Sequence, residues 1–146
     1  MLYLWVVKYW NKIFLKGGYN VRVQMRLSKE GRVVLEELKL EYLKNDEYKT
    51  SGIIVDEIFG YLKNDFYKIN WGLVQSKPEY DGILADYTSV NPTTLNLANQ
   101  TIDTVDEFRN YFNQALNMKR TVYRSFIIRI VLKAFKLKKD GINIYL

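Results

Sequence analysis

The chain has 146 residues, 48% of them hydrophobic and 26% charged, which is typical of one globular domain and not of a disordered chain. It contains neither cysteine nor histidine, so disulfides, thiol catalysis, His-based acid–base chemistry and Cys- or His-ligated metal sites are excluded. The net charge of +6 is unevenly distributed: residues 1–29 hold six basic and no acidic side chains, residues 30–107 hold seven and 15, and residues 108–146 hold nine and one. Basic ends of this kind indicate a polyanionic partner, and the alternative is a charged surface without a partner.

Residues 1–18 form an apolar N-terminal extension, which Lys8 and Lys12 interrupt and which is too short for a transmembrane span. Its apolar side chains recur at helical spacing with the lysines opposite, and this predicts an amphipathic helix; a strand over Leu2 to Val7 is the alternative. No small-residue cleavage site follows, so a signal peptide is not expected. We interpret the apolar face as a cover for the core, with self-association or a membrane interface as the other possibilities.

Strict alternation of apolar and polar side chains between Tyr19 and Leu27 predicts a half-buried strand. The polar face of this strand carries Arg22, Gln24 and Arg26. These side chains can hydrogen-bond base edges in the major groove of DNA, because Arg suits guanine and Gln suits adenine.

Two amphipathic helices are predicted after the strand, since the apolar positions change to helical spacing. Ser28 is a plausible N-cap for the first helix, which is expected to run to about Leu43. Either Thr50 or Ser51 caps the second helix, which continues to about Leu62.

The order of one strand and two helices in residues 19–63 resembles the ribbon-helix-helix family of DNA-binding proteins, which includes the Arc, MetJ and CopG repressors. The resemblance implies that two such units pair their strands into an antiparallel ribbon that enters the major groove. It also implies that the N-terminus of the second helix, at Ser51 with Lys49 beside it, holds a DNA phosphate. Glu57 departs from the family pattern, because a small or apolar residue is usual where the two second helices cross.

A second unit is predicted within the same chain at an offset of 74 residues, the separation of Ser51 and Ser125. The same offset places Val21 over Leu95 and superposes two amphipathic helix patterns. A chance match between amphipathic helices is the competing explanation. Two units in one chain resemble the tandem ribbon-helix-helix proteins of conjugation relaxosomes, such as TraY.

The second unit covers residues 92–139. Its strand is expected over Pro92 to Thr101, with Thr94, Asn96 and Ala98 facing the groove. Thr104 and Glu107 form a capping box that is expected to start the next helix.

The last helix is expected from Val122 to about Lys138. Six of its basic residues are expected to point away from the core, namely Arg124, Arg129, Lys133, Lys136, Lys138 and Lys139. The connection at residues 64–91 is too long and too apolar to be structureless, so it is expected to pack against the domain. The C-terminal tail at residues 140–146 has strand character and could pair with another edge.

The predicted fold is therefore α+β: a single-chain pseudo-dimeric ribbon-helix-helix domain with a two-stranded antiparallel ribbon, four main helices and the apolar N-terminal extension. The candidates for DNA base readout are Arg22, Gln24, Arg26, Thr94 and Asn96. The candidates for DNA phosphate contacts are Lys49, Ser51, Lys119, Arg120, Thr121 and Arg124.

The resemblance implies sequence-specific binding of double-stranded DNA in the cytoplasm, either as a transcriptional regulator or as a relaxosome-type accessory factor of a mobile element such as a virus or plasmid. The pairs Asp46–Glu47 and Asp56–Glu57 are interpreted as surface or cap residues, so no enzymatic activity, cofactor, metal or small-molecule substrate is expected. One alternative is a structural or assembly protein that uses its aromatic surface for oligomerisation, with self-association through residues 1–18. Another is a protein that binds a membrane surface through its basic helices.

Overall fold

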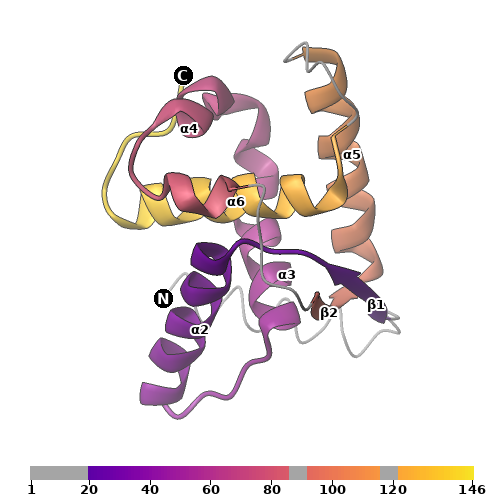
Figure 1. The fold of residues 1–146 in the computed structure, drawn as a ribbon, viewed down its shortest axis with the longest axis vertical. Coiled ribbons are helices and arrows are strands. Elements are labelled where there is room, and N and C mark those ends of the chain that lie inside the picture. The colour runs from indigo at the N-terminus through magenta and orange to yellow at the C-terminus, as the bar shows by residue number, and fades with distance from the viewer. Residues whose placement is uncertain (1–19, 86–91, 116–121) are drawn as a thin grey trace.

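The structure, a computed structural model, describes residues 20–85, 92–115 and 122–146 (Figure 1). Within these ranges the fold is α+β, as predicted, with one two-stranded antiparallel sheet whose inner face is covered by helices. In chain order the elements are β1 (Asn20–Met25), α2 (Lys29–Lys44), α3 (Ser51–Leu62), the 3-10 turn η1 (Lys63–Lys68), α4 (Trp71–Ser76), the 3-10 turn η2 (Asp81–Leu84), β2 (Thr93–Ala98), α5 (Asn99–Ala115) and α6 (Arg124–Lys139). The predicted N-terminal extension lies outside the described residues. None of the helices within these ranges is long and apolar enough to cross a membrane.

The strands β1 and β2 pair with each other in antiparallel orientation, which confirms the pairing expected of the two alternating segments. Both strands are shorter than predicted. At one end Met25 pairs with Thr93, and the preceding Pro92 has no N–H group with which to extend the ladder. At the other end Asn20 pairs with Ala98, after which the chain enters α5 at once.

The first two helices begin where their local sequence predicts. The side-chain oxygen of Ser28 accepts a hydrogen bond from the N–H of Gly31 at 3.0 Å and donates one to the carbonyl of Ile83 at 2.7 Å. The Oγ1 atom of Thr50 accepts a hydrogen bond from the N–H of Ile53 at 3.3 Å, so Thr50 is the N-cap of α3. Each cap satisfies one of the free N–H groups at its helix terminus.

The third main helix, α5, begins at Asn99 and not at Thr104, so the predicted capping box of Thr104 and Glu107 is wrong. Thr104 is buried inside the helix, where its hydroxyl donates to a carbonyl one turn earlier at 2.8 Å. The cap comes instead from α3, because the carboxylate of Asp56 accepts a hydrogen bond from the N–H of Ala98, directly before α5. A carboxylate at this position also interacts favourably with the positive end of the helix dipole.

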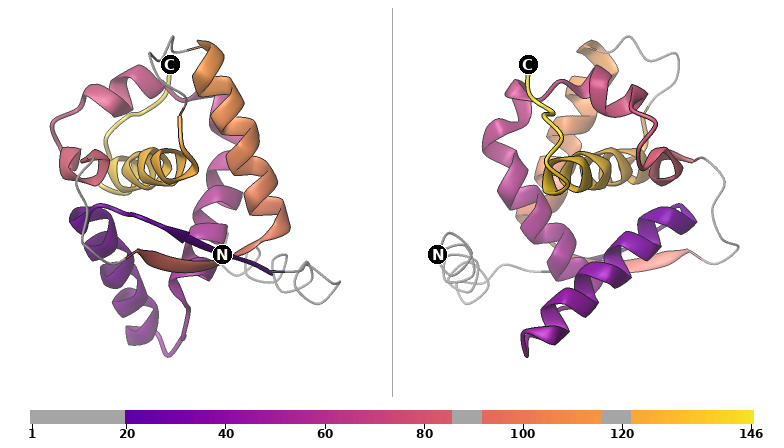
Figure 2. Two further views of the ribbon diagram at one scale, coloured as in Figure 1. Left: turned by 45° about the vertical axis from the view of Figure 1, so that its right-hand side comes forward. Right: turned by 90° about the vertical axis from the view of Figure 1, so that its left-hand side faces the viewer.

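The last helix, α6, lies at the centre of the molecule, and Figure 2 shows it with α3, α5 and the connection around it. Arg129 and Lys133 were expected on its outer face, but they are 7% and 0% exposed, so that expectation is wrong. Both cations donate to backbone carbonyls of the connection, at Gln75 and Lys77 for Lys133 and at Leu84 and Ala85 for Arg129. They are buried because the connection supplies the hydrogen-bond acceptors that buried charges require.

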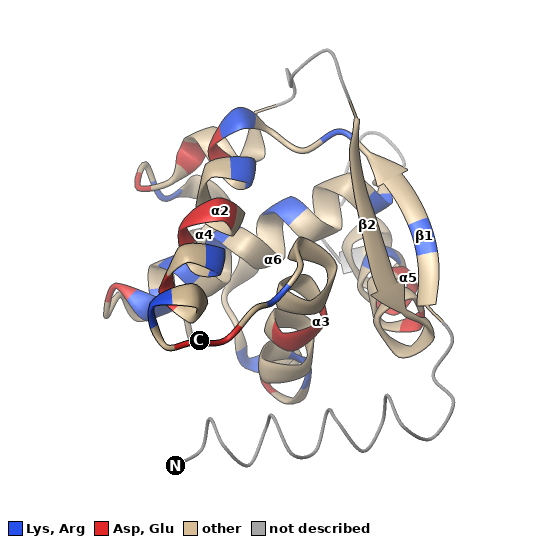
Figure 3. Cartoon of the chain, turned by 90° about the horizontal axis from the view of Figure 1, so that it is seen from below, with Lys and Arg blue, Asp and Glu red and all other residues tan. Residues whose placement is uncertain are grey.

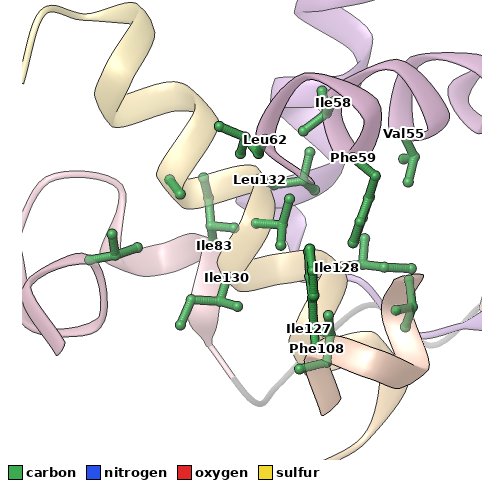
Figure 4. Close-up of a cluster of buried hydrophobic side chains, with 14 of the residues drawn as sticks. Val55, Ile58, Phe59, Leu62, Ile83, Phe108, Ile127, Ile128, Ile130 and Leu132 are labelled. Atoms are coloured by element: carbon green, nitrogen blue, oxygen red, sulfur yellow. The ribbon is translucent and has the colours of Figure 1, made fainter. Parts of the chain in front are cut away.

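The connection between the two halves of the chain packs against the core over its described part, as predicted. Phe66, Trp71 and Ile83 from this segment are almost fully buried. Figure 4 shows Ile83 in the same cluster as side chains from α3, α5 and α6. The C-terminal tail, which could have paired with a strand edge, instead forms one isolated antiparallel bridge between Tyr145 and Ile69 of the connection.

Candidate nucleic-acid interface

Four polar side chains lie together on the outer face of the ribbon. Arg22 and Gln24 of β1 and Thr94 and Asn96 of β2 are all exposed, as the alternation predicts. Arg22 lies opposite Asn96, and Gln24 lies opposite Thr94, so the four form a two-by-two set of cross-strand neighbours. Figure 3 shows β1 and β2 side by side at the surface, with a basic position on β1.

The inner face of the ribbon is more completely buried under β2 than under β1. Leu95 and Leu97 of β2 are 0% exposed, whereas Val21 and Val23 of β1 are half-buried. Ala98 was expected to face the groove, but it is buried because β2 ends there and the chain turns into α5. The exposed outer face of β2 therefore consists of Thr94 and Asn96.

The remaining base-readout candidate, Arg26, follows β1 and is exposed at the end of the ribbon. Together with Arg22 and Lys29 it gives residues 20–29 three basic side chains and no acidic one. This basic edge is suited to the negative potential of a nucleic-acid backbone.

Two of the predicted phosphate residues lie at the start of α3. Ser51 is the first residue of this helix and is half-buried. The ammonium of Lys49 is 2.5 Å from a carboxylate oxygen of Glu57 and lies 4.2 Å from the ring centre of Tyr42. The carboxylate of Glu57 is bound both to Lys49 and to the hydroxyl of Tyr42. The charge of Lys49 is therefore already balanced within the protein.

Arg124, at the first position of α6, forms two hydrogen bonds of 2.9 Å with the carboxylate of Asp106. This bidentate pairing raises the pKa of Arg124 and lowers the pKa of Asp106. The structure thus brings Arg124 together with an acid on α5 and not with the ribbon residues. The other three phosphate candidates, Lys119, Arg120 and Thr121, lie outside the described residues.

Sequence reasoning missed a groove of about 560 Å³ beside the ribbon. It runs along α2 and reaches the start of α3 and the start of β2, and its lining consists of Lys29, Arg32, Val33, Leu35, Glu36, Glu37, Leu40, Ser51 and Thr93. The charged side chains in this lining are two bases, Lys29 and Arg32, and two acids, Glu36 and Glu37. The spacing of three residues between Lys29 and Arg32 on a predicted helix was the signal that could have placed these two on one face.

A buried acid of α3 lies beside the end of β2. Asp56 of α3 is 1% exposed, and its two carboxylate oxygens lie 3.1 and 3.3 Å from the backbone nitrogen of Ala98. Burial raises the pKa of Asp56 to about 6, and hydrogen bonding to the carboxylate opposes only part of this shift. The sequence interpretation was that Asp56 is a surface or cap residue; it is buried, and the N–H group that it binds is 42 residues away.

Within the described ranges no group of acidic residues is arranged to hold a metal ion. Comparisons of the chain with known protein families, with curated proteins and with solved structures found no match.

Proposed function

We propose that this protein binds double-stranded DNA in a sequence-specific manner, with the β1–β2 ribbon in the major groove. The observation that supports this most directly is the exposed two-by-two set of Arg22, Gln24, Thr94 and Asn96. A two-stranded ribbon fits the major groove, and these side-chain types match guanine and adenine edges. The proposed role is that of a transcriptional regulator or a relaxosome-type accessory factor of a mobile element, without catalysis.

We also propose that the chain is a single-chain pseudo-dimer of two strand-helix-helix units. At the 74-residue offset Asn96 is the equivalent of Arg22, and these two residues lie opposite each other in the ribbon. A pseudo-two-fold axis would pass through such a pair. The helices α3 and α6 pack against each other, and α6 begins within one residue of the position that the 74-residue offset gives for the start of α3. The helix α5 begins four residues earlier than the offset gives from the start of α2, because β2 runs into α5 without a loop.

A structural or assembly role is the second candidate, and exposed aromatic side chains favour it. Tyr48 and Tyr123 are 86% and 72% exposed. Large exposed rings of this kind are enriched at protein interfaces. They lie outside the ribbon, so oligomerisation and DNA binding would use different surfaces.

The deciding experiment selects binding sites from random duplexes with the wild type, Arg22→Ala, Asn96→Ala and Lys63→Ala. We expect an asymmetric site, because the two strands present different side chains. Arg22→Ala should relax one or two positions at about 1–3 kcal/mol each, and Asn96→Ala should have a smaller effect. Lys63 is the control, since it is exposed at the end of α3 far from the ribbon.

A symmetric wild-type site, or an unchanged site for Arg22→Ala, would contradict the proposed reading of DNA by the ribbon. Failure to bind any duplex at low salt, together with concentration-dependent oligomers, would favour the assembly role instead.

A further inference from the structure

The N-terminal half of α3 lies directly against the backbone of β2. Gly52 and Asp56 are four residues apart, so both lie on the same face of the helix. Both are buried, and both meet the backbone of the strand that carries Thr94 and Asn96. Because the N–H and C=O groups of a strand point sideways in the plane of the sheet, this contact lies along the edge of β2 that does not pair with β1.

Gly52 is required by the close approach of the helix to the strand. A Cβ atom at this position would lie 2.2 Å from the carbonyl oxygen of Asn96 and 2.9 Å from its carbonyl carbon. Backbone atoms of a paired strand cannot move aside without disturbing the ladder to Arg22. A larger residue at position 52 would therefore push β2 away from α3.

Asp56 holds the end of the same strand through the N–H of Ala98. That N–H group is one of the free donors at the start of α5, so the carboxylate connects α3, β2 and α5 at one point. From β2 and α5 the groups that face this carboxylate are uncharged, namely the N–H of Ala98 and the side chain of Thr101.

Among the described residues the charged groups around Asp56 do little to neutralise it. Glu57 on its own helix raises the pKa of Asp56 further, although Glu57 is itself paired with Lys49. The buried cations of α6, Arg129 and Lys133, donate to the connection. The chain has no histidine, and burial raises the pKa of Asp56 to about 6, within the range in which a histidine would ordinarily titrate.

We infer that Gly52 and Asp56 are positioning residues, which hold the backbone of β2 in the orientation that presents its outer side chains to DNA. The inference rests on the proposed DNA binding. The inference also implies that DNA binding is coupled to proton uptake. DNA phosphates near the ribbon add negative potential at Asp56, and this potential makes the ionised carboxylate less stable. The protein should therefore take up a proton at Asp56 when it binds a duplex.

The test measures affinity for the tightest duplex recovered from a random pool, at pH 7.5 and at pH 5.5 and at constant salt. The wild type should bind between about threefold and tenfold more tightly at the lower pH, since one pKa unit of coupling corresponds to a factor of ten. Asp56→Asn keeps an acceptor for the N–H of Ala98 but does not titrate, so its affinity should be the same at both pH values. In the unbound wild type, the NMR signals of the Asn96 and Ala98 amides should titrate with a midpoint near the pKa of about 6, and in Asp56→Asn they should not.

Gly52→Ala tests the other contact, with Gly72→Ala as its control, because a Cβ at Gly72 would meet nothing closer than 3.6 Å. Gly52→Ala should lose at least tenfold in affinity and lose base preference at the positions under β2 first, while its circular dichroism spectrum stays that of the wild type. If Gly52→Ala does not fold, Asp56→Asn carries the test alone, because that substitution replaces the carboxylate with a group of similar size and adds no atom to the contact with β2.

Three outcomes overturn the inference. If wild type and Asp56→Asn show the same pH dependence while both bind DNA, no proton is taken up at Asp56 and the inference about this residue fails. If Gly52→Ala folds and keeps wild-type affinity and preference, the close contact with Asn96 is irrelevant to binding. If the wild type binds no duplex at either pH, the proposed function itself fails, and the inference fails with it.

Discussion

The helices α3 and α6 correspond at the 74-residue offset, but their surroundings differ. β2 lies against α3, where Gly52 admits the strand backbone and Asp56 binds its last N–H group. At the 74-residue offset, α6 carries Phe126 and Ile130 in place of this pair, and Ile130 is 0% exposed in the central core. Neither side chain can accept a backbone hydrogen bond or leave room for a strand. The difference teaches that two similar helical segments can take separate tasks: α3 supports the ribbon, and α6 fills the core.

The largest effect is expected when Lys133, one of the two cations that α6 buries, is removed. Lys133→Ala should lower the free energy of unfolding by about 3–4 kcal/mol, because the carbonyls of Gln75 and Lys77 lose their donor and a cavity is left. Urea unfolding measures the change. Lys139→Ala is the control, since Lys139 forms an exposed ion pair with Glu41 and should cost no more than about 0.5 kcal/mol. Equal effects of the two substitutions would mean that α6 is not the central helix.

The comparison is sharpened by a stability measurement on the α3 side. The pKa of Asp56 is raised to about 6, above the 3.8 of an ordinary aspartate, so the folded protein holds this proton more tightly than the unfolded chain. The contribution of Asp56 to stability is then greatest below pH 4 and declines as the pH rises to 6. Asp56→Asn should be more stable than the wild type by about 1–3 kcal/mol at pH 7.5 and equal to it near pH 4.

Thermal unfolding across this pH range gives the difference. Asp106→Asn serves as the comparison, because Arg124 lowers the pKa of Asp106 and its effect on stability has the opposite sign. If the difference in stability between Asp56→Asn and the wild type is the same at all pH values, burial does not raise the pKa of Asp56.

The smallest effect is expected at the start of α6. Arg124 and Asp106 are 42% and 40% exposed, so solvent screens their attraction, and Arg124→Ala should change stability by no more than roughly 0.5 kcal/mol. Binding to duplex DNA distinguishes two states of this arginine. If Arg124 contacts a phosphate, Arg124→Ala should reduce the magnitude of the log–log slope of affinity against salt by about 0.9, and its affinity should fall alike for all duplexes. If it stays with Asp106, as in the unbound structure, affinity should not change.

The sequence predicted those features that depend on neighbours in the chain. The alternation from Val21 to Met25 placed Arg22 and Gln24 on the outer face, because a strand has period two whatever packs behind it. Ser28 and a cap at Thr50 or Ser51 were likewise predictable, since a helix N-cap binds a group three residues away.

The features that the sequence did not predict depend on distant partners. The start of α5 is set by Asp56, and no local signal at Asn99 reveals this cap. The sequence placed Arg129 and Lys133 on the solvent face of the last helix, because helical periodicity identifies the polar face of a helix. It does not show that carbonyls of a distant segment cover that face and accept their hydrogen bonds. The same limit applies to Lys49, whose partner Glu57 is on the next helix.

The pairing of β1 with β2 within one polypeptide also determines how the ribbon responds to dilution. In a homodimer the ribbon forms by a bimolecular reaction, so at low concentration its strands separate and the midpoint of unfolding falls. Here the two strands are joined by the packed connection, and assembly of the ribbon is unimolecular. Its melting temperature should therefore be independent of protein concentration, and each molecule should carry a complete ribbon even when only a few copies are present.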